Sequence, residues 1–218
     1  MRTSHRTSFL FAAVVAGLTL SAPSLPVLAQ PAAPAAPAVA SDAEIARVEE
    51  YLNGIRTLKS DFVQVSSDGA AAEGTFYLSR PGRMRIEYDP PVENFIVADG
   101  RFVYFWDAEM REQSNAPIGS TLADFLLRGD IRLSGDVTVT DVQRDGNLLE
   151  VSLVQTKDPG LGQLTLVFED QPLRLRKWRV LDATGQMTEV ALQNPQQGVE
   201  LDRNLFFFRD PTRRQERD

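Results

Sequence analysis

The apolar positions of the chain follow a helical spacing near residue 45 and a strand-like alternation after it. Ser41-Asp42-Ala43-Glu44 is a capping box, in which the serine side chain accepts from an early backbone N–H and Glu44 reaches back. A helix is therefore predicted from this box to near residue 58. Its apolar stripe, which must pack against another element, consists of Ile45, Val48, Leu52, Ile55 and Leu58.

Short segments with strand-like composition fill most of the remaining chain. Asp-Gly pairs at 68–69, 99–100 and 145–146, and Ala-Thr-Gly at 183–185, separate several of these segments. Because Asp-Gly suits the tight turns between antiparallel neighbours, we expect a meander of hairpins. The predicted strands are Ser60–Ser66, Glu73–Arg80, Arg83–Asp89, Asn94–Ala98, Phe102–Asp107, Arg111–Ser114, Asp136–Gln143, Leu148–Gln155, Gly162–Glu169, Leu173–Leu181, Met187–Gln193 and Asn204–Phe208.

The segment PIGSTLADFLLRGD, residues 117–130, interrupts the strands with a second predicted helix of about two turns. Thr121 is placed as its N-cap and Gly129 as its C-cap. A helix this short must cover apolar surface. Its own apolar face consists of Leu122, Phe125 and Leu126, extended by Leu127.

Together these elements predict a mainly β fold with α-helices, namely an incomplete, half-open antiparallel barrel of about 11 strands with a helical lid. The interior of such a barrel is either packed solid or left as a cavity. The runs FVYFW at 102–106 and LFFF at 205–208 are apolar on both faces. We expect these two strands to be covered on both sides.

One arginine shares a strand face with large apolar residues. Side chains two positions apart lie on one face of a strand, so Phe76, Leu78 and Arg80 lie together. Arg80 either leans into solvent at the strand end or faces a cavity. Arg83 and Arg85 have the opposite parity to Met84, Ile86 and Tyr88, and we expect both arginines to point outward into solvent.

The first forty residues have the composition of a leader and a tether. Residues 1–29 carry a basic start and an apolar run from Phe9 to Leu20, the order of parts in a secretory signal peptide. Residues 30–40, QPAAPAAPAVA, form an Ala/Pro-rich linker that favours extended backbone. We expect a single domain over residues 41–210 and a charged tail over 211–218.

Charge and residue usage argue against several functions. The net charge is −7, and loss of Arg2 and Arg6 with the leader would make it two charges more negative. An acidic chain is poorly suited to bind nucleic acid. Cysteine is absent, so the fold has no disulfide and the leader no cysteine for lipid attachment, and the only histidine is His5.

Without an imidazole or thiol in the exported chain, nucleophilic triads and His- or Cys-ligated zinc are excluded. The remaining enzymatic option is a carboxylate pair. The acidic residues near strand ends stand beside Pro, Gly or Asn, so we interpret them as solvated turn residues and not as a catalytic pair. A calcium site at Asp141 and Asp145 is also disfavoured, because their spacing matches no calcium-binding loop. We predict no enzyme activity, no cofactor and no metal. The carboxylates considered are Asp89, Glu93, Asp99, Glu169 and Asp170.

Four motifs in order resemble the outer-membrane lipoprotein carrier family, LolA. They are LKSDFVQ at 58–64, GTFYLSRPGRMRIEYDPP at 74–91, VADGRFVYFWDAEMREQ at 97–113 and LADFLLRG at 122–129. The resemblance implies an incomplete barrel with a lid over an apolar cavity, in the periplasm. It implies a carrier of acylated lipoproteins that receives them from an inner-membrane ABC transporter of the LolCDE type and delivers them to an outer-membrane receptor.

The resemblance also implies a role for Arg80, which matches the family's arginine in Arg-Pro. That arginine hydrogen-bonds lid carbonyls and keeps the cavity closed. A buried cation needs several such partners, and helix carbonyl ends supply them. Residues expected to line the cavity, each with solid core as the alternative, are Phe76, Leu78, Met84, Ile86, Tyr88, Phe102, Tyr104, Trp106, Leu122, Phe125 and Leu126.

Other functions stay open because one fold can serve several. The missing cysteine disfavours a lipid-anchored receptor of the LolB type, and the chain length disfavours a two-domain regulator of the RseB type. The main alternative is a periplasmic carrier or sensor of another hydrophobic ligand, such as a glycolipid, pigment or free lipid. Nothing in the sequence requires a dimer, so we expect a monomer.

Overall fold

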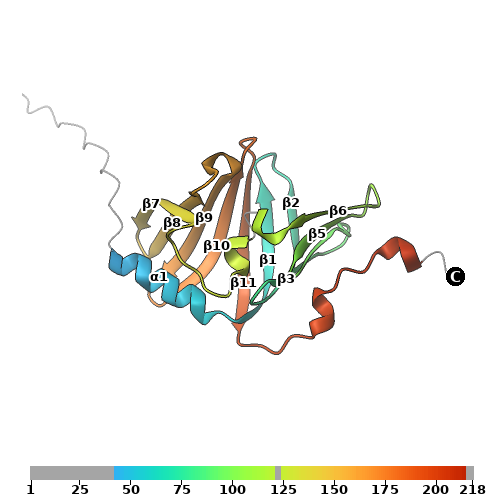
Figure 1. Cartoon of the computed structure of the whole chain (residues 1–218), viewed down its shortest axis with the longest axis horizontal. Helices are drawn as coiled ribbons and strands as arrows, with labels where there is room; N and C mark the ends of the chain where they lie inside the picture. Colours follow the sequence, from blue (N-terminus) through green and yellow to red (C-terminus); the bar gives the residue numbers. More distant parts are fainter. Residues whose placement is uncertain (1–41, 121–123, 215–218) are drawn as a thin grey trace, which may run out of the picture. The chain divides into compact units, whose positions relative to one another are not determined.

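An eleven-stranded antiparallel sheet is the main element of the computed structural model, which describes residues 42–120 and 124–214 (Figure 1). The predicted leader and linker lie outside these described residues. The half-open, mainly β architecture predicted from the sequence is confirmed. The strands are β1 (Thr57–Ser66), β2 (Ala71–Ser79), β3 (Arg83–Tyr88), β4 (Phe95–Asp99), β5 (Phe102–Asp107), β6 (Glu112–Pro117), β7 (Val137–Asp145), β8 (Leu148–Gln155), β9 (Gly162–Asp170), β10 (Leu173–Asp182) and β11 (Met187–Gln197).

The sheet consists of two meanders joined through a long-range pair. Its strand order is β6-β5-β4-β3-β2-β1-β11-β10-β9-β8-β7, so every strand except β1 and β11 has only sequence neighbours beside it. The pair β1–β11 joins the two meanders, with Phe62 opposite Leu192. Strands β6 and β7 are the two open edges.

Hairpin turns occur where the glycine-containing links were predicted. Gly69, Gly100, Gly146 and Gly185 all have positive φ angles, which a glycine adopts without steric cost. A larger residue at Gly74, inside β2, would meet the neighbouring strand instead, because a Cβ there would lie 2.0 Å from the Glu87 carbonyl oxygen. Gly74 therefore permits close approach of β2 and β3.

One face of the sheet, called the inner face here, carries the core. Buried side chains from β1, β2, β8, β9, β10 and β11 join those of the helices in one contiguous cluster. Phe168, Leu149 and Leu166 have no measurable exposure. Helix α1 (Asp42–Gly54) lies across the strand ends of the second meander, and α2 (Asp124–Leu127) lies over the inner face (Figure 1).

Helix α1 is shorter than the sequence pattern predicts, and the second predicted helix is described only in part. Helix α1 ends at Gly54, and β1 already begins at Thr57, so Ile55 and Leu58 of the predicted stripe reach the core from the connection and the strand. Among the described residues of segment 117–130, the helical ones are the 3₁₀ turn η1 (Ile118–Ser120) and the four residues of α2. The proposed caps Ser41 and Thr121, and Leu122, lie outside the described residues.

The predicted strand Asn204–Phe208 is wrong. The structure has a 3₁₀ helix there, η3 (Arg203–Phe206), followed by η4 (Pro211–Arg214) in the charged tail. The Asp202 side chain accepts from the Asn204 N–H and starts the turn. The apolar run that indicated a strand instead packs onto the outer face, where Phe208 stacks with Tyr104 at 5.0 Å between ring centroids.

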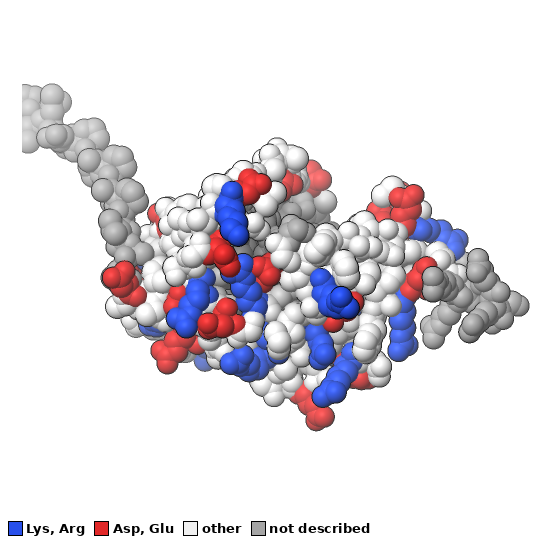
Figure 2. Space-filling view, viewed as in Figure 1, with Lys and Arg blue, Asp and Glu red and all other residues white. Residues whose placement is uncertain are grey.

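Acidic and basic side chains are interspersed on the face of the molecule seen in Figure 2. Several form ion pairs with one another, as described below. Within the described residues, none of the helices combines the length and apolar character needed to cross a membrane.

Candidate functional site

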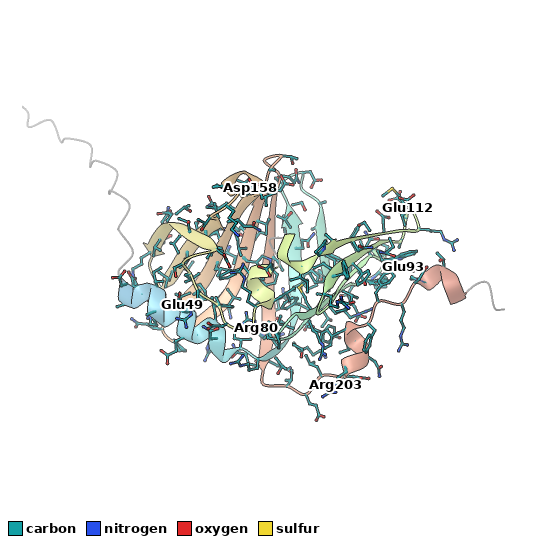
Figure 3. All side chains as sticks on the ribbon, in the orientation of Figure 1. Glu49, Arg80, Glu93, Glu112, Asp158 and Arg203 are labelled. Atoms are coloured by element: carbon teal, nitrogen blue, oxygen red, sulfur yellow. The ribbon has the colours of Figure 1, made fainter. Side chains whose placement is uncertain are left out.

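The Arg80 guanidinium joins the two helices from the end of β2. Its Nε donates to the Leu126 carbonyl in α2 at 2.7 Å, and its Nη1 donates to the Ile55 carbonyl at 3.1 Å and to the Leu52 carbonyl. Leu52 lies in the last turn of α1 and Ile55 directly after the helix, and Figure 3 labels Arg80. One side chain therefore holds three carbonyls from two helices.

These carbonyls are suitable partners because the last turn of a helix leaves its C=O groups without intrahelical donors. The same end carries the negative pole of the helix dipole, which favours a cation. Burial, followed by repulsion from Arg56, lowers the pKa of Arg80 to about 10. The guanidinium therefore remains charged at neutral pH, and each of its bonds is charge-assisted.

A second set of hydrogen bonds attaches α1 to the segment after α2. The Asn53 side-chain amide donates to the Ile131 carbonyl at 2.9 Å and accepts from the Ile131 N–H at 2.8 Å. Glu49 accepts from the Leu133 N–H at 2.6 Å. Gly82 N–H, in the β2–β3 turn, donates to the Leu127 carbonyl at 2.8 Å. The two helices and the segment through Leu133 thus form one hydrogen-bonded layer, called the lid here.

The N-terminal end of α1 is held by an ion-pair cluster that sequence analysis missed. Asp170 had been read as a solvated turn residue, yet it is 7% exposed. It pairs with Arg47 of α1 at 2.5 Å and with Arg144 of β7 at 2.5 Å, and Arg144 also pairs with Glu44. We call these four residues the α1 clamp. The only sequence signal for this clamp was the position of Asp170 next to the β9–β10 turn. That signal is weak, because acidic residues at turns are usually solvated.

Most of the side chains predicted to line a cavity lie on the inner face under or beside the lid. Phe76, Leu78, Met84, Phe125 and Leu126 belong to the buried cluster. Ile86 and Tyr88 pack against it and are only partly buried. Burial raises the pKa of Tyr88, although its hydroxyl hydrogen-bonds Gln64 at 2.9 Å.

Phe102, Tyr104 and Trp106 lie on the opposite face, so their expected place in the interior is wrong. Strand register puts Ile96 opposite Phe105 and Val97 opposite Tyr104. Ile96 packs against the inner cluster, so Tyr104, one residue from Phe105, points outward. Both faces of this strand are apolar, and the sequence pattern alone therefore leaves its inner face undetermined.

The outward-facing aromatic residues are covered by the C-terminal segment. Trp106 stacks with Phe95, and Phe95 contacts Phe208. Arg85, expected in solvent, lies 5.0 Å over the Phe95 ring and donates to the Leu205 carbonyl at 3.3 Å. This cluster binds the C-terminal segment to the sheet and is separate from the inner face.

The described part of the lid packs closely against the second meander. Between α2 and strands β7–β9 there is a crevice of about 10 Å³, lined by residues that include Phe125, Leu153 and Leu164. That volume is about the minimum for one water molecule, so an apolar ligand can enter here only if the lid moves. The lid is attached by these polar bonds and by buried apolar side chains of α1, α2 and the segment to Leu133, which belong to the core cluster.

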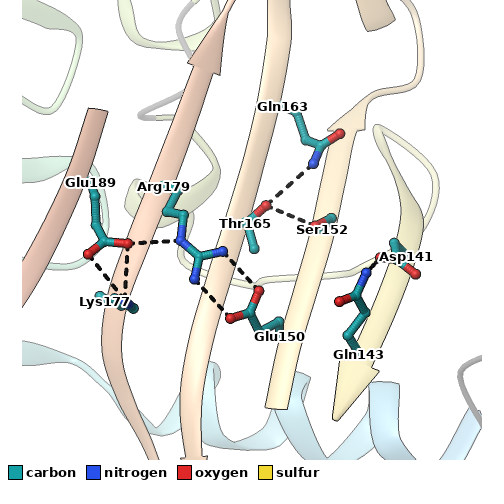
Figure 4. A network of polar contacts seen from close by, with 9 residues as sticks. All are labelled: Asp141, Gln143, Glu150, Ser152, Gln163, Thr165, Lys177, Arg179 and Glu189. Carbon is teal, nitrogen blue, oxygen red and sulfur yellow. Dashed lines mark hydrogen bonds and ion pairs between the residues drawn. The ribbon is translucent and has the colours of Figure 1, made fainter. Parts of the chain in front are cut away.

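A polar network covers part of the outer face of the second meander (Figure 4). Arg179 binds Glu150 through two bonds of 2.9 Å and Glu189 through one of 2.8 Å, and these carboxylates raise its pKa. Burial opposes ionisation of Glu189, but bonds from Arg179 and Lys177 outweigh it and lower its pKa. The network joins β8, β10 and β11, and it supports the sheet behind the interior.

The fold and the site together define a half-open antiparallel barrel whose apolar inner face lies under a hydrogen-bonded helical lid. The chain belongs to the outer membrane lipoprotein carrier protein LolA family, whose model matches residues 53–209. It is similar to the outer-membrane lipoprotein carrier protein of Methylococcus capsulatus, with 31% identity over 79% of this chain and 88% of that protein. The corresponding protein of Chromohalobacter salexigens is 28% identical over 91% of this chain and 92% of the relative.

A solved structure of a LolA superfamily protein from Nitrosomonas europaea is also similar. It matches with a TM-score of 0.45 at 10% sequence identity, and the match covers 75% of this chain and 97% of that one.

Proposed function

We propose that the protein is a carrier of lipoproteins, which shields their acyl chains between the inner face of the sheet and the lid. The observation that carries this proposal is the position of Arg80, a charged side chain that joins both lid helices by hydrogen bonds directly above an apolar face. Membership of the lipoprotein carrier family supports the same function.

The energies involved allow both uptake and release. Burying an acyl chain of about sixteen carbons gains roughly 12 kcal/mol at about 0.8 kcal/mol per methylene. Lifting α2 exposes Phe125, Leu126 and Leu127, all buried here, at roughly 1.5–3 kcal/mol each. Breaking the Arg80 bonds costs a few kcal/mol more. These costs offset part of the gain from burying acyl chains, so the lipid can be taken up and still be released.

Arg80 acts in this scheme as the lid lock. Its bonds form when the interior is empty and break when acyl chains lift the helices. The inner-face residues Phe76, Leu78, Met84, Ile86 and Tyr88, with Phe125 and Leu126 from α2, then contact the lipid. Leu122 lies outside the described residues, and its predicted contact with lipid stays part of this proposal.

The place of action we propose is the periplasm, reached through a signal peptide over residues 1–29. An inner-membrane ABC transporter of the LolCDE type would load the carrier, and an outer-membrane receptor would unload it. The protein acts as a monomer and catalyses no reaction. Its domain spans residues 41–210, with the linker 30–40 preceding it.

Mass spectrometry of the protein recovered from the periplasm tests the proposal. We expect copurified triacylated protein, enriched when Arg80→Leu is used in place of the native chain. Recovery of a free lipid, glycolipid or pigment alone would favour a carrier or sensor of another hydrophobic ligand and contradict lipoprotein transport.

A further inference from the structure

The hydrogen-bonded ladder between β10 and β11 ends before the two strands do. Its last pair is Lys177 with Ala191, although β10 begins at Leu173 and β11 continues to Gln197. The start of β10 remains paired with β9, and the end of β11 remains paired with β1. At this end the sheet therefore contains two strand edges that face each other without pairing.

Two irregularities at the same level explain the separation. In β10, Leu175 lies opposite Phe168 and Lys177 opposite Val167, so Arg176 is an extra residue. Between Lys59 and Asp61 the register advances by two residues in β1, whereas it advances by three in β11, from Gln193 to Gln196. Asn194 lies in this stretch of β11 and has a φ angle of 51°. A bulge interrupts strand pairing, and here both strands carry a register irregularity next to the point where their ladder stops.

A groove of about 420 Å³ lies at this gap. It includes residues of both faces of the sheet, because Leu175 belongs to the buried cluster while Arg174 and Arg176 are exposed. Neither arginine forms an ion pair with another residue of the described chain. The lining consists of Tyr51, Leu173, Arg174, Leu175, Arg176, Pro195 and Gln197.

Tyr51 of α1 occupies the gap in the closed state. Its hydroxyl oxygen accepts from the Leu175 N–H at 2.9 Å and from the Gln197 side-chain amide at 3.0 Å. The other side of its ring meets Phe168 edge-on at 5.8 Å, within the core. Because Tyr51 belongs to the lid, movement of α1 releases the Leu175 N–H and leaves a backbone donor on an open strand edge.

We propose that the gap between β10 and β11 binds the extended polypeptide of a lipoprotein cargo next to its lipid-bearing residue. This inference rests on the proposed function. Open strand edges bind extended chains through main-chain hydrogen bonds. The groove reaches the core through Leu175 and Tyr51, so a chain whose acyl groups lie under the lid can leave the interior here. Arg174 and Arg176 favour a segment that carries carboxylates.

Backbone methylation of the cargo tests this pairing directly. The probes are a short triacylated cysteinyl peptide, the same peptide N-methylated at alternate residues, and a free fatty acid. N-methylation removes the donors on one edge of the peptide without changing the lipid. We expect the methylated peptide to bind about 30-fold more weakly than the unmethylated one, which corresponds to about 2 kcal/mol. The affinity of the fatty acid shows how much of the binding comes from the lipid alone.

Hydrogen exchange locates the pairing. The amide of Leu175 should become more protected with the unmodified lipopeptide than with the fatty acid, and Arg174→Gln with Arg176→Gln should weaken binding of an acidic lipopeptide. Arg83→Gln, an exposed site on β3, is the charge-matched control. Equal affinity for methylated and unmethylated lipopeptides would overturn this inference while leaving the carrier function intact. Failure of lipopeptides and fatty acid alike to bind would reject the carrier function itself.

Discussion

At the scale of single residues, the Arg80 guanidinium is the group on which the closed state depends most. Alternation along β2 predicts that Arg80 shares a face with Phe76 and Leu78. In the structure both apolar residues belong to the core cluster, and Arg80 contacts the lid on the same side. Its acceptors could not be derived from spacing, because they lie in the two helices and directly after α1, 25 to 46 residues away in sequence. Only three-dimensional packing brings those carbonyls to one point.

Replacing Arg80 by Leu should open the lid and slow release of bound acyl chains. The substitution removes three charge-assisted bonds, each worth about 1.5–3 kcal/mol, which favour the closed state and expulsion of the ligand. Dissociation of a triacylated lipopeptide should slow by at least about tenfold. Stopped-flow displacement measures this rate. Arg83→Leu provides the matched control, and a wild-type release rate for Arg80→Leu would refute the lid-lock role.

Gly74→Ala should be strongly destabilising, by more than about 3 kcal/mol. The added methyl would lie 2.0 Å from the Glu87 carbonyl oxygen, so β2 and β3 would have to separate. Gly54→Ala, at the end of α1, has nothing within 4 Å of the added methyl and should cost little. Urea unfolding of both variants measures the difference in stability. Equal unfolding midpoints would contradict the close approach of β2 and β3 as the reason for a glycine at position 74.

At the scale of elements, the strands were far more predictable than the helical segments. Asp-Gly links and alternating residues located eleven strands, and β5 and β8 have the predicted bounds. The C-terminal run LFFF had strand composition, but it wraps onto the outer face as a 3₁₀ turn because Asp202 starts that turn. Tertiary contacts with Phe95 and Tyr104 decide its conformation.

Helix α1 should loosen in acid because of its clamp. Hydrogen bonding from Arg144, reinforced by Arg47 and opposed by burial, lowers the pKa of Asp170. A carboxylate with a lowered folded-state pKa contributes stability above its unfolded pKa of about 3.9, and this contribution is lost as pH falls through the folded value. The protection of α1 amides, expressed relative to their intrinsic exchange rates at each pH, should therefore fall as pH drops below about 4.

Asp170→Asn is the control for the clamp. It should lower the protection of α1 amides already at neutral pH and remove most of the additional loss of protection in acid. If the variant and the native chain had the same exchange rates at neutral pH, Asp170 would not be what holds the helix.

At the scale of the whole molecule, an open sheet with two free edges is stable because one face is covered by the lid and part of the other by the C-terminal segment. Sequence patterns predicted this architecture, but they misassigned which face of β5 is inner. Where both faces are apolar, parity alone cannot distinguish them. The long-range β1–β11 pair joins the two meanders into one sheet, and no local pattern encodes it.

Opening of the lid above the inner face is the central claim, and a disulfide across the lid tests it most directly. The chain contains no cysteine, and a Cβ at position 129 would lie 3.5 Å from the Pro81 Cβ, within the range for a disulfide. In the double variant Pro81→Cys, Gly129→Cys, triacylated lipopeptide should bind when the pair is reduced and fail to bind when it is oxidised. Equal binding in both states would show that acyl chains are held without lid opening, and would contradict the account.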